Sequence, residues 1–270
     1  MFRWSVLSLF DLRLSSDATS ECSMELEAEY NARMKSQQCN KSLQEVLGEN
    51  YLDFMKSLFE QSYNDLCMVF SAPEDYLKGG ERTLFSEVFI QQFKNSGKMT
   101  KLLQFVWWIE KKMPNIDHSW LMAKNNINFI MLESSGVVEE IFKHTLEDTT
   151  KNLKHGTELL ASMLCSYRSC NINTVKRIVV LTGHIIGNKL TIIKYSCGNS
   201  QKWSACEVRL CEVPLTFESR KATIKLFEVF AYIYLTLKEQ EKVYDQLADE
   251  KLGLVNVEEM DKAQNSQCFL

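Results

Sequence analysis

Glycine and proline are scarce in this sequence of 270 residues, which contains 10 glycines and 3 prolines. Proteins built from many short strands need many turns, and they use these two residues to make them. The scarcity therefore argues against a β-sandwich or a β-barrel. It favours a mainly α-helical fold.

Long apolar runs are also missing, because no stretch of 18 consecutive apolar residues occurs. We therefore expect no membrane-spanning segment. The apolar stretch near the first residue is interrupted by Asp11 and Arg13, and no small-residue cleavage pattern follows it cleanly. The nine cysteines are an odd number in a scattered arrangement, as is typical of reduced thiols. These features favour a cytoplasmic or nuclear protein, with secretion as the minor alternative.

Motifs for catalysis or cofactor binding are absent from the sequence. It contains no P-loop, no dinucleotide fingerprint, no nucleophile elbow and no HExxH motif. The two CxxxxC pairs argue against a zinc site, because residues i and i+5 lie about 140° apart on a helix and on opposite faces of a strand. These pairs are Cys165 with Cys170 and Cys206 with Cys211. We expect a non-enzymatic protein without a metal or another cofactor.

The overall charge is slightly negative, with 31 basic and 35 acidic residues, a net charge of -4 and a pI near 5.7. Such a chain has no general attraction to nucleic acid or to an anionic membrane. Hydrophobic residues make up 45% of the sequence and charged residues 24%, which is ordinary for a globular protein. A chain of this length can bury a large core.

Two stretches of the sequence have matching patterns at an offset of 39 residues, Ser96–Met113 and Ser135–Glu147. Each begins with a Ser-Gly pair, and the apolar positions after the two pairs coincide. The matched positions are Met99 with Val138, Leu102 with Ile141, and Leu103 with Phe142. Each copy has the pattern of a helix end, a glycine stop and a new amphipathic helix, which indicates an α-helical repeat.

The segments FIQQFKNSGKMTKLLQFV (89–106) and FIMLESSGVVEEIFKHTL (129–146) resemble the helix-Gly-helix core of armadillo or HEAT repeats. This resemblance implies a right-handed α-solenoid with a concave surface that binds a partner. A third copy near Asn173 is weaker, and the two ends of the chain do not fit the period. An irregular helical bundle with one internal duplication is therefore the alternative.

The chain divides into an N-terminal segment and linker (1–23), a single helical-repeat domain (24–255) and a polar tail (256–270) that we expect to be frayed. The longest predicted helix is Glu218–Ala248. It is apolar nearly all round between Ile224 and Leu237, so we expect it to be packed on several sides.

A small β element is expected near 176–213. Residues 206–213 alternate like a strand, and the β-branched stretch 176–195 fits either two short helices, as the repeat favours, or a hairpin around Gly183 and Gly187.

A partner-binding surface is predicted on the helix that follows Gly97. At 100° per residue, two aromatic residues and two lysines lie opposite its apolar face, and the second copy adds polar side chains at equivalent positions. Tryptophan is a frequent energetic hot spot in interfaces. The predicted partner-binding residues are Lys101, Phe105, Trp108, Lys112, Glu140 and His144. Burial of the aromatic side chains under a further helix is the alternative.

These patterns predict a protein-protein interaction module or scaffold that binds a peptide or a helix of a partner protein. The alternative is a helical nucleic-acid-binding protein in which Lys101, Lys111 and Lys112 contact phosphates. The acidic composition weighs against that alternative, since a nucleic-acid backbone needs continuous positive potential. The sequence leaves the oligomeric state open.

Overall fold

The computed structural model describes residues 51–78, 83–107, 119–123, 128–135, 141–198 and 203–265. Side chains are described within 61–76, 83–102, 130–134, 149–198 and 203–265. The statements below concern these parts of the chain.

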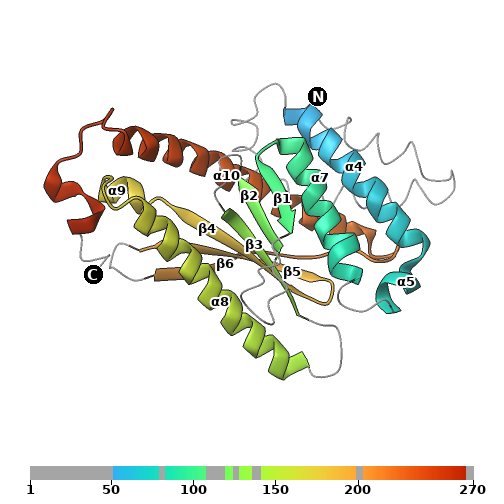
Figure 1. The fold of residues 1–270 in the computed structure, drawn as a ribbon. Coiled ribbons are helices and arrows are strands. Elements are labelled where there is room, and N and C mark those ends of the chain that lie inside the picture. Colours follow the sequence, from blue (N-terminus) through green and yellow to red (C-terminus); the bar gives the residue numbers. More distant parts are fainter. Residues whose placement is uncertain are drawn as a thin grey trace.

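Within the described residues, helices flank one β-sheet (Figure 1). The longer ones are α4 (Tyr51–Ser71), α7 (Ile90–Thr100), α8 (Ile141–Ser166) and α10 (Thr223–Lys251). The shorter ones are α5 (Pro73–Lys78), the π-helix η2 (Leu84–Phe89), α9 (Ile172–Val175), and the 3-10 turns η3 (Arg220–Ala222), η4 (Glu259–Asp261) and η5 (Ala263–Asn265).

The sheet has six strands, and their order in space is their order in the sequence. They are β1 (Leu103–Trp107), β2 (Ser119–Ala123), β3 (Asn128–Ser135), β4 (Val179–Ile186), β5 (Lys189–Cys197) and β6 (Trp203–Glu212). Strands β3 and β4 run parallel, whereas each other neighbouring pair is antiparallel. Helix α8 makes the crossover between the two parallel strands, as a parallel pair requires. Two three-stranded meanders are thus joined through α8.

The two faces of the sheet are covered by different helices. Asn152 of α8 bonds to Thr182 of β4, so α8 lies on the face to which Thr182 points. The guanidinium group of Arg209 lies 4.6 Å from the ring centroid of Tyr232, which places α10 on the opposite face. Figure 1 shows α8 in front of the sheet and α10 behind it. The fold is therefore a three-layer α/β/α arrangement.

Strand β4 lies at the centre of the core. Seven of its residues, from Val179 to Ile185, are buried, because both of its faces are covered. A run of apolar and β-branched residues is typical of such a strand. On the α10 side, the rings of Phe93 and Phe230 meet edge to face with centroids 5.1 Å apart, which joins α7 to α10.

The predicted fold class is wrong. The structure is neither a mainly α-helical armadillo or HEAT-like solenoid nor an all-α bundle, because a six-stranded mixed sheet forms its centre. The β element expected near 176–213 is real, but it is half of a larger sheet. Residues 176–195 adopt the hairpin alternative, with Gly187 at a φ of 58° in the turn between β4 and β5.

The prediction of an α-helical repeat is also wrong. Gly97 does not begin a helix but lies buried inside α7, and Leu103, assigned to the same helix, begins strand β1. In the second copy, the apolar stretch before Gly136 is strand β3 rather than a helix. The matching positions thus arise from different secondary structures, because short apolar runs have no periodicity that distinguishes a helix from a buried strand.

The long helix predicted at Glu218–Ala248 agrees with α10. Its apolar section packs on several sides, since Leu226, Val229 and Phe230 are all buried. Among the described helices, none combines the length and the apolar character that a membrane crossing requires.

Candidate interaction surface

The predicted binding residues do not share a helix. Helix α7 ends at Thr100, Lys101 follows it in a left-handed conformation with a φ of 54°, and Phe105 is in strand β1. His144 belongs to α8, but its side chain is outside the described set. Trp108, Lys111, Lys112 and Glu140 lie outside the described residues. Their role in binding stays a prediction, although the helical geometry that suggested it is wrong.

A layer of polar side chains lies between α8 and the sheet. The register places Glu133 of β3 beside His184 of β4, and Thr182 precedes His184 by two positions on the same face. Thr182 Oγ1 donates to Asn152 Oδ1 at 2.6 Å, and the hydroxyl group of Tyr195 lies 3.1 Å from the same oxygen. All five residues are buried.

Burial is the main influence on the pKa of Tyr195 in this layer. Burial raises the pKa of Tyr195 above its ordinary value, and the nearby charge of Glu133 raises it further, while a hydrogen bond with Thr182 lowers it. None of these side chains is more than 4% exposed, so a substrate has no direct access to them. The contacts with Asn152 hold α8 on the sheet. We therefore assign the layer a structural role.

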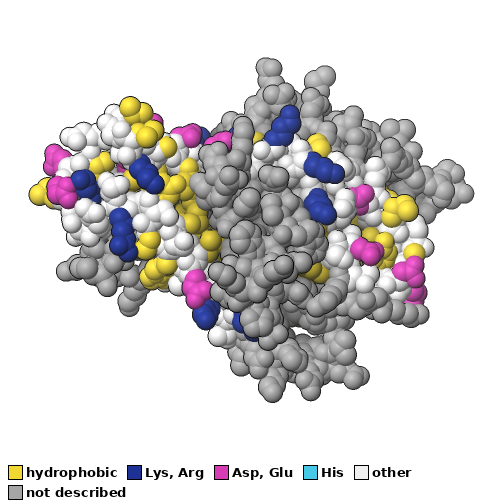
Figure 2. Space-filling model, viewed as in Figure 1, with side chains coloured by type: hydrophobic (Ala, Val, Ile, Leu, Met, Phe, Trp, Pro, Cys, Tyr) yellow, Lys and Arg dark blue, Asp and Glu magenta, His cyan; other side chains and the backbone are white. Residues whose placement is uncertain are grey.

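A different feature is found in the segment after α10, residues 252–265. Four large apolar side chains in nine residues are exposed: Leu252 by 75%, Leu254 by 72%, Val255 by 46% and Met260 by 79%. Single exposed apolar residues are normal on protein surfaces, whereas a concentration of them marks an interaction site. Figure 2 shows hydrophobic, acidic and basic side chains at the end of the molecule where Figure 1 draws this segment.

The start of the segment is held by the end of helix α10. Gly253 has a φ of 75°, which glycine adopts without the steric cost that a Cβ would add. Its amide donates to the carbonyl oxygen of Glu250 at 3.2 Å, and the amide of Leu254 donates to that of Asp249 at 2.9 Å. These two bonds form a Schellman motif. The motif fixes the backbone at Leu254 while the side chain remains exposed.

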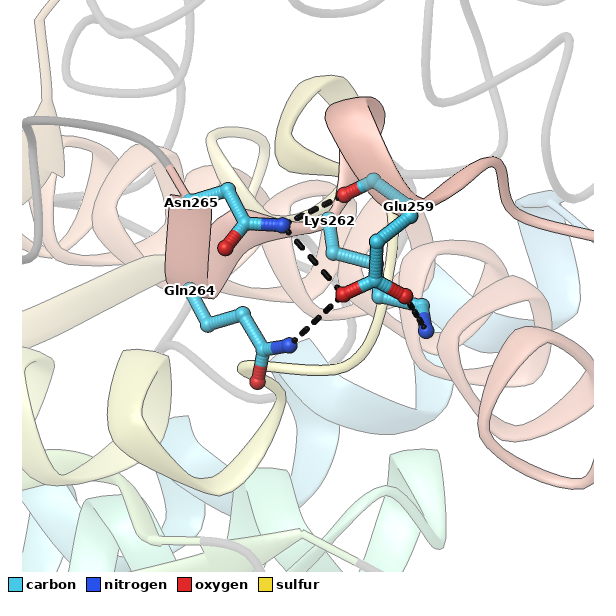
Figure 3. Close-up of polar contacts among 4 residues, drawn as sticks. All are labelled: Glu259, Lys262, Gln264 and Asn265. Carbon is cyan, nitrogen blue, oxygen red and sulfur yellow. Dashed lines mark hydrogen bonds and ion pairs between the residues drawn. The ribbon is translucent and has the colours of Figure 1, made fainter.

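The end of the segment is held by Glu259 (Figure 3). Its carboxylate pairs with Lys262 at 2.5 Å. It also accepts hydrogen bonds from the side-chain amides of Gln264 at 3.3 Å and Asn265 at 3.4 Å. Asn265 also donates to the Glu259 carbonyl oxygen. These bonds define a compact turn where the sequence predicted a frayed tail.

The same turn is attached to the rest of the protein. The backbone amide of Ala263 donates to the carbonyl oxygen of Cys170 at 2.9 Å, and the backbone amide of Gln264 donates to the carbonyl oxygen of Arg168 at 2.9 Å. Ala263 is fully buried. The exposed apolar side chains are thus presented by a fixed backbone rather than by a free tail.

The surface charge of the segment is negative. Asp249, Glu258 and Asp261 are exposed and form no ion pair with any residue in the described parts of the chain. Two lysines in this part of the chain, Lys251 and Lys262, have partners within the protein. Lys251 lies over the ring of Tyr167, 5.5 Å from its centroid, and Lys262 pairs with Glu259. Unpaired carboxylates therefore border the exposed apolar residues.

Comparison of the chain with protein families, with curated proteins and with solved structures gives no match. The resemblance to armadillo and HEAT repeats is accordingly not supported, and the mixed sheet contradicts it. Sequence reasoning missed Leu252, Leu254, Val255 and Met260. Their signal was the close succession of apolar residues on both sides of Gly253, beyond the point where the amphipathic pattern of α10 ends.

Proposed function

We propose that this protein is a protein-protein interaction module that binds its partner through Leu252, Leu254, Val255 and Met260. The observation that carries this proposal is the exposure of these four apolar side chains on a backbone fixed at both ends. A binding surface that is ordered before association loses less conformational entropy on binding. Burial of such side chains in an interface supplies the main favourable free energy.

Site-specific photo-crosslinking tests the proposal. A photoreactive amino acid at Leu254 is expected to capture a discrete partner in cells, whereas the same amino acid at the exposed Glu158 of α8 is expected to capture none. The captured protein is then purified, and its affinity is measured for the Leu252→Ser/Leu254→Ser/Met260→Ser variant. We expect a loss of about 100-fold, because removal of hot-spot side chains costs 2 kcal/mol or more.

A matched control changes three exposed apolar residues elsewhere, in the Met68→Ser/Leu153→Ser/Leu210→Ser variant. This variant should bind the partner as the unmodified protein does. Unchanged affinity of the first variant would contradict the proposal. Loss of binding in the Phe105→Ala/Trp108→Ala variant alone would instead assign binding to the surface predicted from the sequence.

Nucleic-acid binding is a second candidate, and a row of lysines supports it. Lys94 and Lys98 lie one turn apart on α7, and Lys101 follows the helix. Figure 2 shows a row of basic side chains over α7. The net charge of -4 opposes this function. Binding of a single-stranded or duplex oligonucleotide that weakens steeply with salt, and that the Lys94→Ala/Lys98→Ala/Lys101→Ala variant loses, would support it.

A further inference from the structure

The residues around the exposed apolar side chains indicate the chemistry of the partner. We infer that the partner presents an apolar surface bordered by lysine or arginine side chains, as one face of a basic amphipathic helix does. This inference rests on the proposed function, since it concerns the same segment. It adds the charge and the form of the partner.

The first support is a set of exposed carboxylates that have no ion pair within the described protein and are available to a partner. Asp249, Glu258 and Asp261 are exposed, and no described residue forms an ion pair with them. Asp249 is the first residue of the Schellman motif, and Glu258 and Asp261 flank Met260 closely in sequence. Along the chain, the three carboxylates therefore lie near the two ends of the apolar set.

The second support is that three cations near the segment, Lys251, Lys262 and Arg168, have contacts within the protein, Arg168 with Cys165 Sγ at 3.3 Å. Lys262 pairs with Glu259 at 2.5 Å, and Lys251 lies over Tyr167 and donates to the carbonyl oxygen of Ser166 at 3.5 Å. Within the described parts of the chain no ion pair engages the three carboxylates, so they are available to basic side chains of another molecule. Complementary charges around an apolar contact increase the association rate and select the partner.

The test uses a synthetic peptide of leucine and lysine, about 14 residues long, which forms roughly four turns of an amphipathic helix. A second peptide has glutamate at every lysine position. Binding of each labelled peptide to the full chain is measured by fluorescence anisotropy at low and at physiological salt. We expect the leucine-lysine peptide to bind and the leucine-glutamate peptide not to bind.

Two charge variants with the same net charge decide where the peptide binds. In the Asp249→Lys/Glu258→Lys/Asp261→Lys variant, the affinity for the leucine-lysine peptide should fall about tenfold, since rim charges modulate association. The Glu87→Lys/Glu207→Lys/Glu239→Lys variant changes three exposed acids outside the segment and should bind as the unmodified protein does.

Equal losses in the two variants would overturn the inference, because net charge alone would explain them. Equal affinity for the two peptides, or no binding of the leucine-lysine peptide, would overturn it too. These results leave the proposed function standing if the serine variant still loses the captured partner. Sedimentation that shows self-association dependent on Leu254 would overturn the inference by identifying a second copy of the chain as the occupant.

Discussion

Gly156 of α8 lies directly against the aromatic ring of Tyr195 on β5. A Cβ atom at this glycine would come within 2.7 Å of three ring carbons, Cζ, Cε1 and Cε2. Such distances are not tolerated, so the absence of a side chain sets how closely the helix approaches the sheet. This contact joins the crossover helix to the second meander.

Substitution of Gly156 by alanine is therefore expected to destabilise the protein. Alanine favours the helix by about 1 kcal/mol relative to glycine, but overpacking against a buried ring costs about 1–3 kcal/mol. We expect a net decrease in the free energy of unfolding, measured by urea denaturation. The Lys154→Ala variant, at an exposed position two residues earlier on α8, should show almost no change. An increase in stability for Gly156→Ala would contradict the contact.

Thr182 and Tyr195 both contact Asn152, so their contributions to stability should be coupled. Thr182→Val removes a buried hydrogen bond to Asn152 Oδ1 and should cost about 1–3 kcal/mol of unfolding free energy. Tyr195→Phe should cost about 1 kcal/mol by removing the hydroxyl group.

The double variant should not show the sum of the two single effects, because both groups act through one amide. A double-mutant cycle measured by urea denaturation provides the coupling free energy. Thr157→Val makes the same chemical change on the outer part of α8 and is the control. Strict additivity of Thr182→Val and Tyr195→Phe would mean that Asn152 does not connect them.

His155 should make the protein less stable in mild acid. Burial lowers the pKa of this imidazole below its ordinary value of 6.5, and Lys154 and Lys151 lower it further, against an opposing effect of Glu158. The unfolded chain thus takes up a proton more readily than the folded one. The protonation of His155 therefore does not reduce the free energy of unfolding above about pH 6.5, and it reduces that free energy as the pH falls below this value.

Denaturation of the unmodified protein and of His155→Gln between pH 5 and 8 checks this sign, over the range in which histidine titrates. The difference in stability between the two proteins should change with pH in the direction that favours His155→Gln in acid. A difference independent of pH would show that His155 titrates equally in both states. The other histidines are present in both proteins and cancel in the comparison.

The cysteines should differ in their reactivity towards a thiol reagent. Burial raises the pKa of Cys211 to about 12, and burial also raises the pKa of Cys170. Cys165 and Cys206 are exposed free thiols. Because the thiolate is the reactive form, brief alkylation of the native protein should label Cys165 and Cys206 and spare Cys170 and Cys211.

Peptide mass spectrometry measures the labelling of each site. Denaturation before alkylation should make all four sites react, which is the internal control. Rapid native labelling of Cys211 would contradict its position beneath α10.

Part of the fold could be predicted from the sequence. The length and continuous apolar section of α10 are local properties of residues 223–251, so the helix and its burial followed from composition and periodicity. The sequence also offers the hairpin at 176–195 as one alternative, because Gly187 and the β-branched residues around it are local signals as well.

The six-stranded sheet could not be predicted in the same way. Strands β1 and β3 are short, and their apolar residues also fit a helical pattern at the 39-residue offset. Their conformation depends on pairing, and β3 pairs with β4 across the whole of α8. Such contacts between distant residues leave no periodic trace in either strand.

The proposed interaction surface likewise depends partly on the local sequence and partly on the tertiary structure. The sequence by itself determined which residues after Gly253 are apolar and which are acidic, and it set the turn that glycine permits there. The tertiary structure decided that Leu254 and Met260 remain exposed while Ala263 is buried. The position of this segment depends on backbone hydrogen bonds to Cys170 and Arg168. The fold brings these two residues to the segment although they lie more than 90 residues away along the chain. Exposure is a property of what packs nearby, and packing between distant segments exists only in the folded chain.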